Sequence, residues 1–231
     1  MSQSGTEIDR DPLGSQVRAD PRPLRPLSFA VLITALAGFL DAIGYVQLNH
    51  LFVSFMSGNS THLGITLAEG AWPDALLAIG VIASFVAGAI LGTSIADRAG
   101  SSLLIHVLRA ETVVLVVSIL LAVSDHGQTA LILIALAMGM QNTLHQVVSG
   151  ADIGKGFITG TLFALGQSIS RAVGDRKEAL RIAPNAVCWI AFVGGAVAGA
   201  RTLSAFGLTC CLVAAAATLL ALQAGLRFGR L

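Results

Sequence analysis

Long apolar runs alternate with short polar breaks along this chain, and most of the runs have the length of membrane helices. Read by apolar length and breaks, they cover about 27–48, 54–69, 74–97, 103–123, 129–147, 156–171, 181–201 and 206–226. Six of them are long enough to cross a hydrocarbon layer of about 30 Å as helices. The runs at 54–69 and 156–171 are shorter, and the first is polar in its opening half. We therefore expect an all-α integral membrane protein with six transmembrane helices and two short re-entrant or broken helices, and no run alternates like a barrel strand.

The composition agrees with a membrane protein. Of 231 residues, 55% are hydrophobic and only 12% are charged, which is too little polar surface for a soluble globule of this size. The net charge of +1 and the lack of a basic patch interleaved with aromatic residues argue against a nucleic-acid partner. The three cysteines lie in apolar segments without metal-ligand spacing. We therefore expect no metal and no cofactor. The lipid bilayer is the expected environment of the protein.

The chain divides into a tail and one membrane domain. Residues 1–26 are polar and hold four of the six prolines, so they read as a disordered cytoplasmic tail rather than a cleavable signal peptide. Residues 27–231 form a single membrane domain.

An internal repeat of about 100 residues runs through that domain. FVAGAILG at 85–92 recurs as FVGGAVAG at 192–199, and the polar decapeptide FMSGNSTHLG at 55–64 is echoed by FITGTLFALG at 157–166. In both halves a glycine and a polar residue come before the decapeptide, and a glycine stripe follows it. The halves cover about 27–123 and 129–226, and close helix packing is the expected use of the stripes.

Charge decides between two topologies for these halves. Three full spans and one re-entrant helix in each half make the repeats inverted, whereas four full spans in each half make them parallel. With six spans and a cytoplasmic N-terminus, the inside loops collect most of the Lys and Arg residues, while the outside receives Glu69, Asp74, Asp125 and only Arg201. The positive-inside rule therefore favours inverted repeats with both termini in the cytoplasm.

The two decapeptides are the candidate solute site. Ser57, Asn59 and Ser60 are N-cap residue types, and Gly58 permits a bend, so a helix start there would offer free N–H groups to an anion, a carboxylate or a carbonyl oxygen. The same small residues would alternatively only let helices pack closely. The candidate solute-binding residues are Asp41, Ser57, Gly58, Asn59, Ser60, Thr61, His62, Asn142, Thr159, Gly160 and Thr161.

Two acidic residues lie deep within predicted spans. Asp41 is about fourteen residues into the first span and Glu111 about eight into the fourth, where an unpaired charge is costly. Each must be paired, protonated or in contact with water, so both are candidates for proton coupling, and Asp41 would otherwise cap the adjacent short helix. His62 is either a titrating group or a packed, hydrogen-bonded residue.

Two long segments carry a resemblance to a known family. GFLDAIGYVQLNHLFVSFMSGNSTHLG and GMQNTLHQVVSGADIGKGFITGTLFALGQ resemble the bacterial YoaK-like membrane proteins (domain of unknown function 1275). The family's glycine and aspartate, its threonine-glycine-asparagine turn and its second threonine-glycine-threonine turn fall on Gly38, Asp41, Gly58, Asn59, Thr159, Gly160 and Thr161. Ser57 stands where the family usually has threonine. The resemblance implies a multi-pass protein of the bacterial inner membrane and brings no substrate or reaction.

Two functions remain open at this point. A small-solute transporter or channel, with its site between the two short helices and with proton coupling, uses the buried acidic residues. A membrane scaffold or partner-binding protein is the alternative, and an enzyme is disfavoured because no nucleophile motif, metal spacing or close carboxylate pair occurs. The oligomeric state is open, and includes a homo-oligomer.

Overall fold

The computed structural model describes residues 27–99, 103–143, 147–148, 151–152, 158–172, 174 and 176–227. These residues are almost entirely helical, which confirms the all-α prediction. The elements are α1 (Leu27–Gln47), α2 (Met56–Glu69), α3 (Trp72–Ala99), α4 (Leu103–Val123), α5 (Gly127–Gln141), β1 (Val147–Val148), β2 (Ala151–Asp152), α6 (Ile158–Arg171) and α7 (Arg176–Arg227). The predicted tail, 1–26, lies outside the described residues.

Four helices, α1, α3, α4 and α7, are long and apolar enough to cross a membrane. α5 is equally apolar but has only 15 residues. α2 and α6 have 14 residues each, and their predicted shortness is confirmed. The chain is therefore a multi-pass membrane protein.

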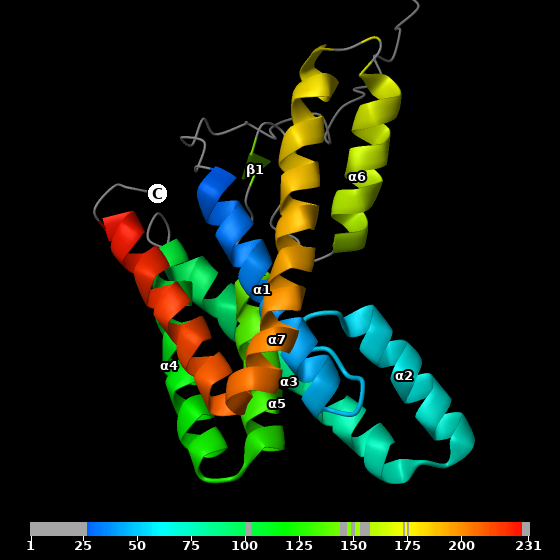
Figure 1. Cartoon of the computed structure of the whole chain (residues 1–231), viewed down its shortest axis with the longest axis vertical. Coiled ribbons are helices and arrows are strands. Elements are labelled where there is room, and N and C mark those ends of the chain that lie inside the picture. Colours follow the sequence, from blue (N-terminus) through cyan, green and yellow to red (C-terminus); the bar gives the residue numbers. More distant parts are fainter. Residues whose placement is uncertain are drawn as a thin grey trace, which may run out of the picture.

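The last two predicted segments, 181–201 and 206–226, are joined in one helical element, α7. Gly207 interrupts it with φ 76° and ψ 175°, a conformation that residues with a side chain rarely adopt. At this point the chain reverses, so that the two parts of α7 run in opposite directions (Figure 1). The helical stretch is also longer at its start than expected, because it begins at Arg176.

The predicted helix 129–147 is too long at its end. α5 stops at Gln141, with Asn142 as its C-cap, and the next described residues form the antiparallel pair of β1 and β2. The run of polar residues after Met140 explains the early end, since such residues gain little from burial in an apolar bundle.

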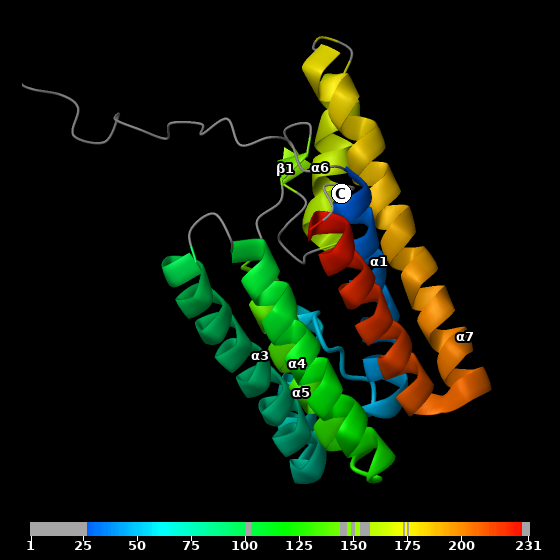
Figure 2. The same ribbon diagram turned by 90° about the vertical axis from the view of Figure 1, so that its left-hand side faces the viewer.

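The helices form two layers (Figure 2). α3, α4 and α5 make one layer, and α1 and α7 make the other, while α6 packs on α7 and α2 packs on α3. Each layer thus combines helices from both predicted repeats. Short turns join neighbouring helices, such as the one at Gly70, where the backbone is left-handed with φ 71°.

Glycines bring the backbones of these helices into direct contact. A methyl group added at Gly38, Gly195 or Gly199 would collide with the opposing backbone across the contact of α1 with α7, and one added at Gly88, Gly92 or Gly139 would do so across the contact of α3 with α5. The predicted close-packing role of the glycine stripes is confirmed.

The two glycine contacts correspond to each other residue by residue. Gly38 lies on the Phe192 carbonyl in one, and Gly139 lies on the Phe85 carbonyl in the other. Residue numbers of corresponding positions differ by 101 between α1 and α5 and by 107 between α3 and α7. The two remaining contacts follow the same offsets: Gly195 with Ala35 matches Gly88 with Leu136, and Gly199 with Phe39 matches Gly92 with Met140. The first helix of each half therefore packs on the third helix of the other half.

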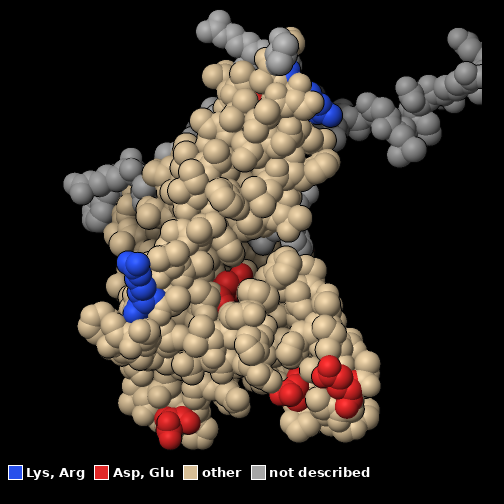
Figure 3. Space-filling model, turned by 45° about the vertical axis from the view of Figure 1, so that its right-hand side comes forward, with Lys and Arg blue, Asp and Glu red and all other residues tan. Residues whose placement is uncertain are grey.

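Charged side chains differ between the two ends of the molecule. Figure 3 shows a group of acidic side chains at the lower end and basic side chains higher up on that face. The lower turns carry Glu69, Asp74 and Asp125, whereas Arg98, Arg171 and Arg227 lie at helix ends on the opposite side.

Replacement of Gly195 by alanine tests the backbone contact. Its new methyl group would meet the Ala35 carbonyl, whereas nothing lies within 4 Å of a methyl group at the neighbouring Gly194. We expect Gly195→Ala to lower the free energy of unfolding by about 1–3 kcal/mol through overpacking. Gly194→Ala, the matched control, should be neutral or stabilise by up to about 1 kcal/mol through helix propensity.

Thermal unfolding in detergent measures both variants. Equal melting temperatures for the two would contradict the close contact of α1 with α7.

Candidate functional site

The connection between α1 and α2 is held by the buried carboxylate of Asp41. Oδ1 accepts hydrogen bonds from the backbone N–H groups of Val53 (2.9 Å) and Ser54 (2.7 Å), and Oδ2 accepts one from the Ser54 hydroxyl (2.6 Å). The Asp41 side chain is only 3% exposed. The prediction that this carboxylate is paired is confirmed, and its partners lie just before the short helix. Asp41 thus satisfies backbone groups that neither a helix nor lipid could satisfy.

Asn59 performs a related task from within α2. Its Oδ1 accepts a hydrogen bond from the Phe52 N–H (2.8 Å), and its Nδ2 donates one to the Phe52 carbonyl (2.7 Å). The side chain is completely buried. Both ends of the amide are therefore used by the connecting chain, and Asn59 is a positioning residue rather than an open ligand.

The prediction that Ser57, Asn59 or Ser60 caps the start of α2 is wrong. α2 begins at Met56 with Phe55 as its N-cap, and no side chain of the described residues caps its first turn. Ser60 and Thr61 instead donate to the carbonyls four residues before them, Met56 at 2.8 Å and Ser57 at 3.0 Å. Hydroxyl groups within a helix have this local alternative to capping.

The bend expected at Gly58 is also wrong, because Gly58 lies inside α2 with helical backbone. Its role is to leave space: a methyl group there would come within 2.6 Å of the Phe55 ring and 3.2 Å of the Phe52 ring. Sequence reasoning assigned the glycine to backbone freedom, and the structure assigns it to ring packing.

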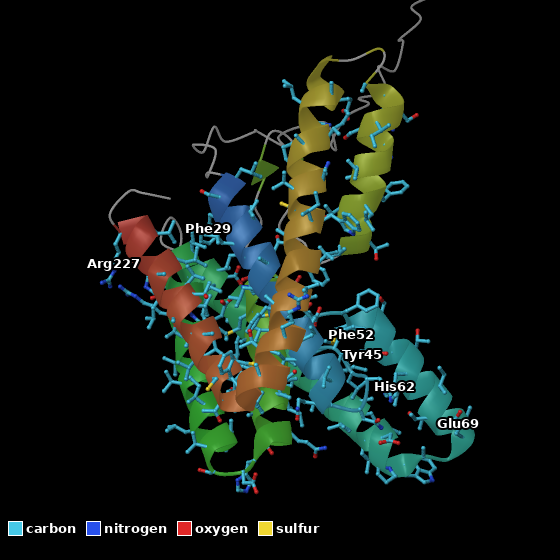
Figure 4. All side chains as sticks on the ribbon, in the orientation of Figure 1. Phe29, Tyr45, Phe52, His62, Glu69 and Arg227 are labelled. Atoms are coloured by element: carbon cyan, nitrogen blue, oxygen red, sulfur yellow. The ribbon has the colours of Figure 1, made fainter. Side chains whose placement is uncertain are left out.

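An aromatic cluster surrounds this connection, and sequence reasoning missed it. Tyr45 lies 5.0 Å from His50 and 5.0 Å from Phe52, and Phe52 lies 5.3 Å from Phe55, all between ring centroids. Figure 4 shows Tyr45 and Phe52 together near the start of α2, with His62 further along that helix. Four rings within eleven residues, in a chain with only 6% Phe, Trp and Tyr, were a signal for the cluster.

The second short helix, α6, carries the remaining residues of the predicted site. Thr159 and Gly160 are exposed at the start of α6, and Thr161 is buried at 9% exposure. In Figure 1 the starts of α2 and α6 face each other at mid-height of the molecule, on the same side of α7. No hydrogen bond between the described residues of α2 and α6 is found, and the shared site of the two decapeptides stays a prediction.

The remaining candidates belong to three different helices. Asn142 caps α5, and its Nδ2 donates to the Met138 carbonyl at 2.9 Å. His62 is half-buried in α2, and its Nε2 is buried without a hydrogen-bond partner in the part of the chain that the structure describes. Glu111 lies on α4, on the opposite side of the molecule from α2 and α6 (Figure 1). The described residues contain no group of three His, Cys, Asp or Glu side chains that could hold a metal ion.

Comparison with known proteins identifies the family of this chain. A family model described as a protein of unknown function (DUF1275) matches residues 29–224. The chain belongs to this family. It is 33% identical to the UPF0700 transmembrane protein RA0705 of Rhizobium meliloti over 181 residues, 75% of this chain and 74% of that protein. It is 28% identical to the UPF0700 transmembrane protein YoaK of Bacillus subtilis over 156 residues, 64% of this chain and 68% of that protein. No solved structure is significantly similar.

In this DUF1275 protein, the positions that suggested the family have definite structural tasks. Gly38 contacts the Phe192 backbone, Asp41 and Asn59 hold the chain before α2, and Gly58 makes room for two rings. The signature of the first half therefore describes how a short helix is attached to the bundle.

Removal of the Asp41 carboxylate tests this attachment. Asp41→Ala leaves the N–H groups of Val53 and Ser54 buried without acceptors, so we expect a loss of about 2–5 kcal/mol in the free energy of unfolding. Ser54→Ala removes a single hydroxyl bond and should cost about 1 kcal/mol. Ser57→Ala, at an exposed position of the same segment, is the control and should have little effect.

Thermal unfolding and limited proteolysis of the α1–α2 connection rank the stability of the three variants. If Asp41→Ala had the melting temperature and the proteolysis pattern of the wild type, Asp41 would not hold this connection.

Proposed function

We propose that this protein is a six-span carrier or channel for a small solute, built from two inverted repeats in the bacterial inner membrane. The six spans are α1, α3, α4, α5 and the two parts of α7. α2 and α6 are short helices that enter the bundle from opposite sides. The observation that supports the proposal is the position of both helix starts at mid-height on the same side of α7, since inverted repeats with short helices commonly form transporter sites there.

Two observations support inverted repeats. The helices that correspond by sequence run in opposite directions: α1 runs downward and α5 upward, and α3 runs upward while the first part of α7 runs downward (Figure 1). The glycine contacts of α1 with α7 also correspond to those of α5 with α3. A two-fold axis in the membrane plane produces both features.

The charge distribution supports an orientation with both termini in the cytoplasm. The acidic turns lie at one end, and most described arginines lie at the other, which is the end where α1 begins and α7 finishes. By the positive-inside rule, the arginine-rich end faces the cytoplasm.

The solute site lies between the first turns of α2 and α6. Ser57 and Thr159 present exposed hydroxyl groups there, and the uncapped first turn of α2 adds free N–H groups and the positive end of the helix dipole. A solute with acceptor oxygens, such as a carboxylate, suits these donors. Asp41 and Asn59 hold the α2 side of this site in position.

Single-cysteine labelling tests the topology. In a background without Cys188, Cys210 and Cys211, we expect an impermeant maleimide to label Glu69→Cys and Asp125→Cys in intact cells, and Arg98→Cys only after permeabilisation. Eight full spans require the opposite pattern, with Arg98→Cys labelled in intact cells.

Ligand response tests the site. The purified protein is screened by thermal shift and by proteoliposome uptake against carboxylates, amino acids and inorganic anions. Thr159→Val and Ser57→Ala should each weaken the response about tenfold, which corresponds to the loss of one hydrogen bond of about 1.4 kcal/mol. Thr218→Val, in the last part of α7, is the control and should respond like the wild type.

An unchanged response in both site variants would move the solute site elsewhere. The absence of any response or uptake would favour the scaffold function instead.

A further inference from the structure

Glu111 is a completely buried acidic residue in the middle of α4, at 0% exposure. Neither of its carboxylate oxygens has a hydrogen-bond partner among the described residues. Gln141, at the end of α5 and 8% exposed, interacts with this carboxylate. The Gln141 Nε2 is itself buried without a partner of regular hydrogen-bond geometry. An acid and an amide thus face each other inside the protein without completing a bond.

Three helices enclose this pair. Gln223 from the second part of α7 donates to the Leu108 carbonyl at 3.1 Å and to the Thr112 hydroxyl at 2.7 Å. These two residues flank Glu111 on α4, so α7 is tied to α4 at the level of the carboxylate. α5 closes the remaining side, because it packs along α4.

The titratable groups on these helices do not neutralise Glu111. α5 contains no Asp, Glu, Lys, Arg or His, and those of α3 (Asp74, Asp97 and Arg98) lie at its ends. On the second part of α7, Arg227 is the last helical residue and is exposed, and the thiols of Cys210 and Cys211 are at least twelve residues, or about 18 Å of helix, from Gln223. On α4 itself, Arg109 is exposed and two positions away, hence on another face, and His106 is more than a turn earlier.

We propose that Glu111 and Gln141 form an internal proton-binding site, in which Glu111 holds a proton while α4, α5 and α7 are packed together. An ionised carboxylate without a partner is too costly in this setting, so it takes a proton from water and becomes neutral. The neutral acid can donate its O–H to the Gln141 amide oxygen and accept an N–H from the same amide. A small side-chain adjustment then satisfies both groups.

The comparison with Asp41 separates the two candidates for proton coupling. Asp41 accepts three hydrogen bonds from donors that lie in one connection, so both of its oxygens already have fixed partners. Glu111 has none among the described residues. Glu111 is therefore the proton carrier, and it returns its proton to water only when the three helices separate. Its part in transport rests on the function proposed above, whereas its protonation does not.

Infrared spectroscopy of the purified protein tests the protonation directly. The spectrum at neutral pH should contain a carbonyl band of a protonated carboxylic acid that disappears in Glu111→Gln. The matched variant Asp41→Asn should keep that band. If Glu111→Gln removes only carboxylate bands, or if the acid band is lost in Asp41→Asn, the proposal is overturned. These spectra do not depend on any solute, so a failed transport assay leaves their outcome unaffected.

Melting temperature against pH gives a second measurement on the wild type itself. The melting temperature should fall by several degrees from mildly acidic to mildly alkaline pH, because deprotonation would leave a buried charge. Glu111→Gln resembles the protonated acid and should flatten this part of the profile without a loss of stability at neutral pH. A wild-type melting temperature that rises with Na⁺ or K⁺ at constant ionic strength would show a metal-cation site and overturn the proposal.

Discussion

The contact of glycine with backbone carbonyl is the constraint on which the rest of the bundle depends. Lipid is as apolar as a leucine side chain, so helices in a membrane gain from close packing rather than from leaving water. Here the first helix of each half lies against the third helix of the other half, with glycines at the points of closest approach. Neither half can keep these contacts alone. The halves are therefore interlocked parts of one unit, and each layer of the molecule contains helices from both.

This close packing leaves the short helices at the edge of the bundle, where their attachment needs polar side chains. A break between helices exposes N–H and carbonyl groups that lipid cannot satisfy. In the first half Asp41 and Asn59 supply the partners for residues 52–54. The described helices of the two halves share their packing, because the same glycine contacts join α1 to α7 and α5 to α3.

The apolar runs predicted most of the fold, because a membrane helix must be apolar along its length. The glycine stripes predicted the close helix contacts, because glycines four residues apart lie on one face of a helix. The site was harder to predict. Ser57, Asn59 and Ser60 have good N-cap propensity, but the chain before Met56 is fixed by Asp41, which moves the helix start upstream. The surroundings of Glu111 depend on Gln141 and Gln223 from other helices, and no local pattern reveals which residues meet across a bundle.

The two buried acidic residues, Asp41 and Glu111, use the same carboxyl group for two different roles. Asp41 is fixed by donors from a single connection, so its carboxylate holds that connection in place. Glu111 faces only an amide, and its neutral form depends on the packing of α5 against α4. Gly139 lies two residues before Gln141 and rests on the Phe85 carbonyl of α3. A movement of α5 that admits water to Glu111 must therefore also shift its contact with α3, which is joined to α2 by the turn at Gly70. The proton site and the short helix are in this way connected through α5 and α3.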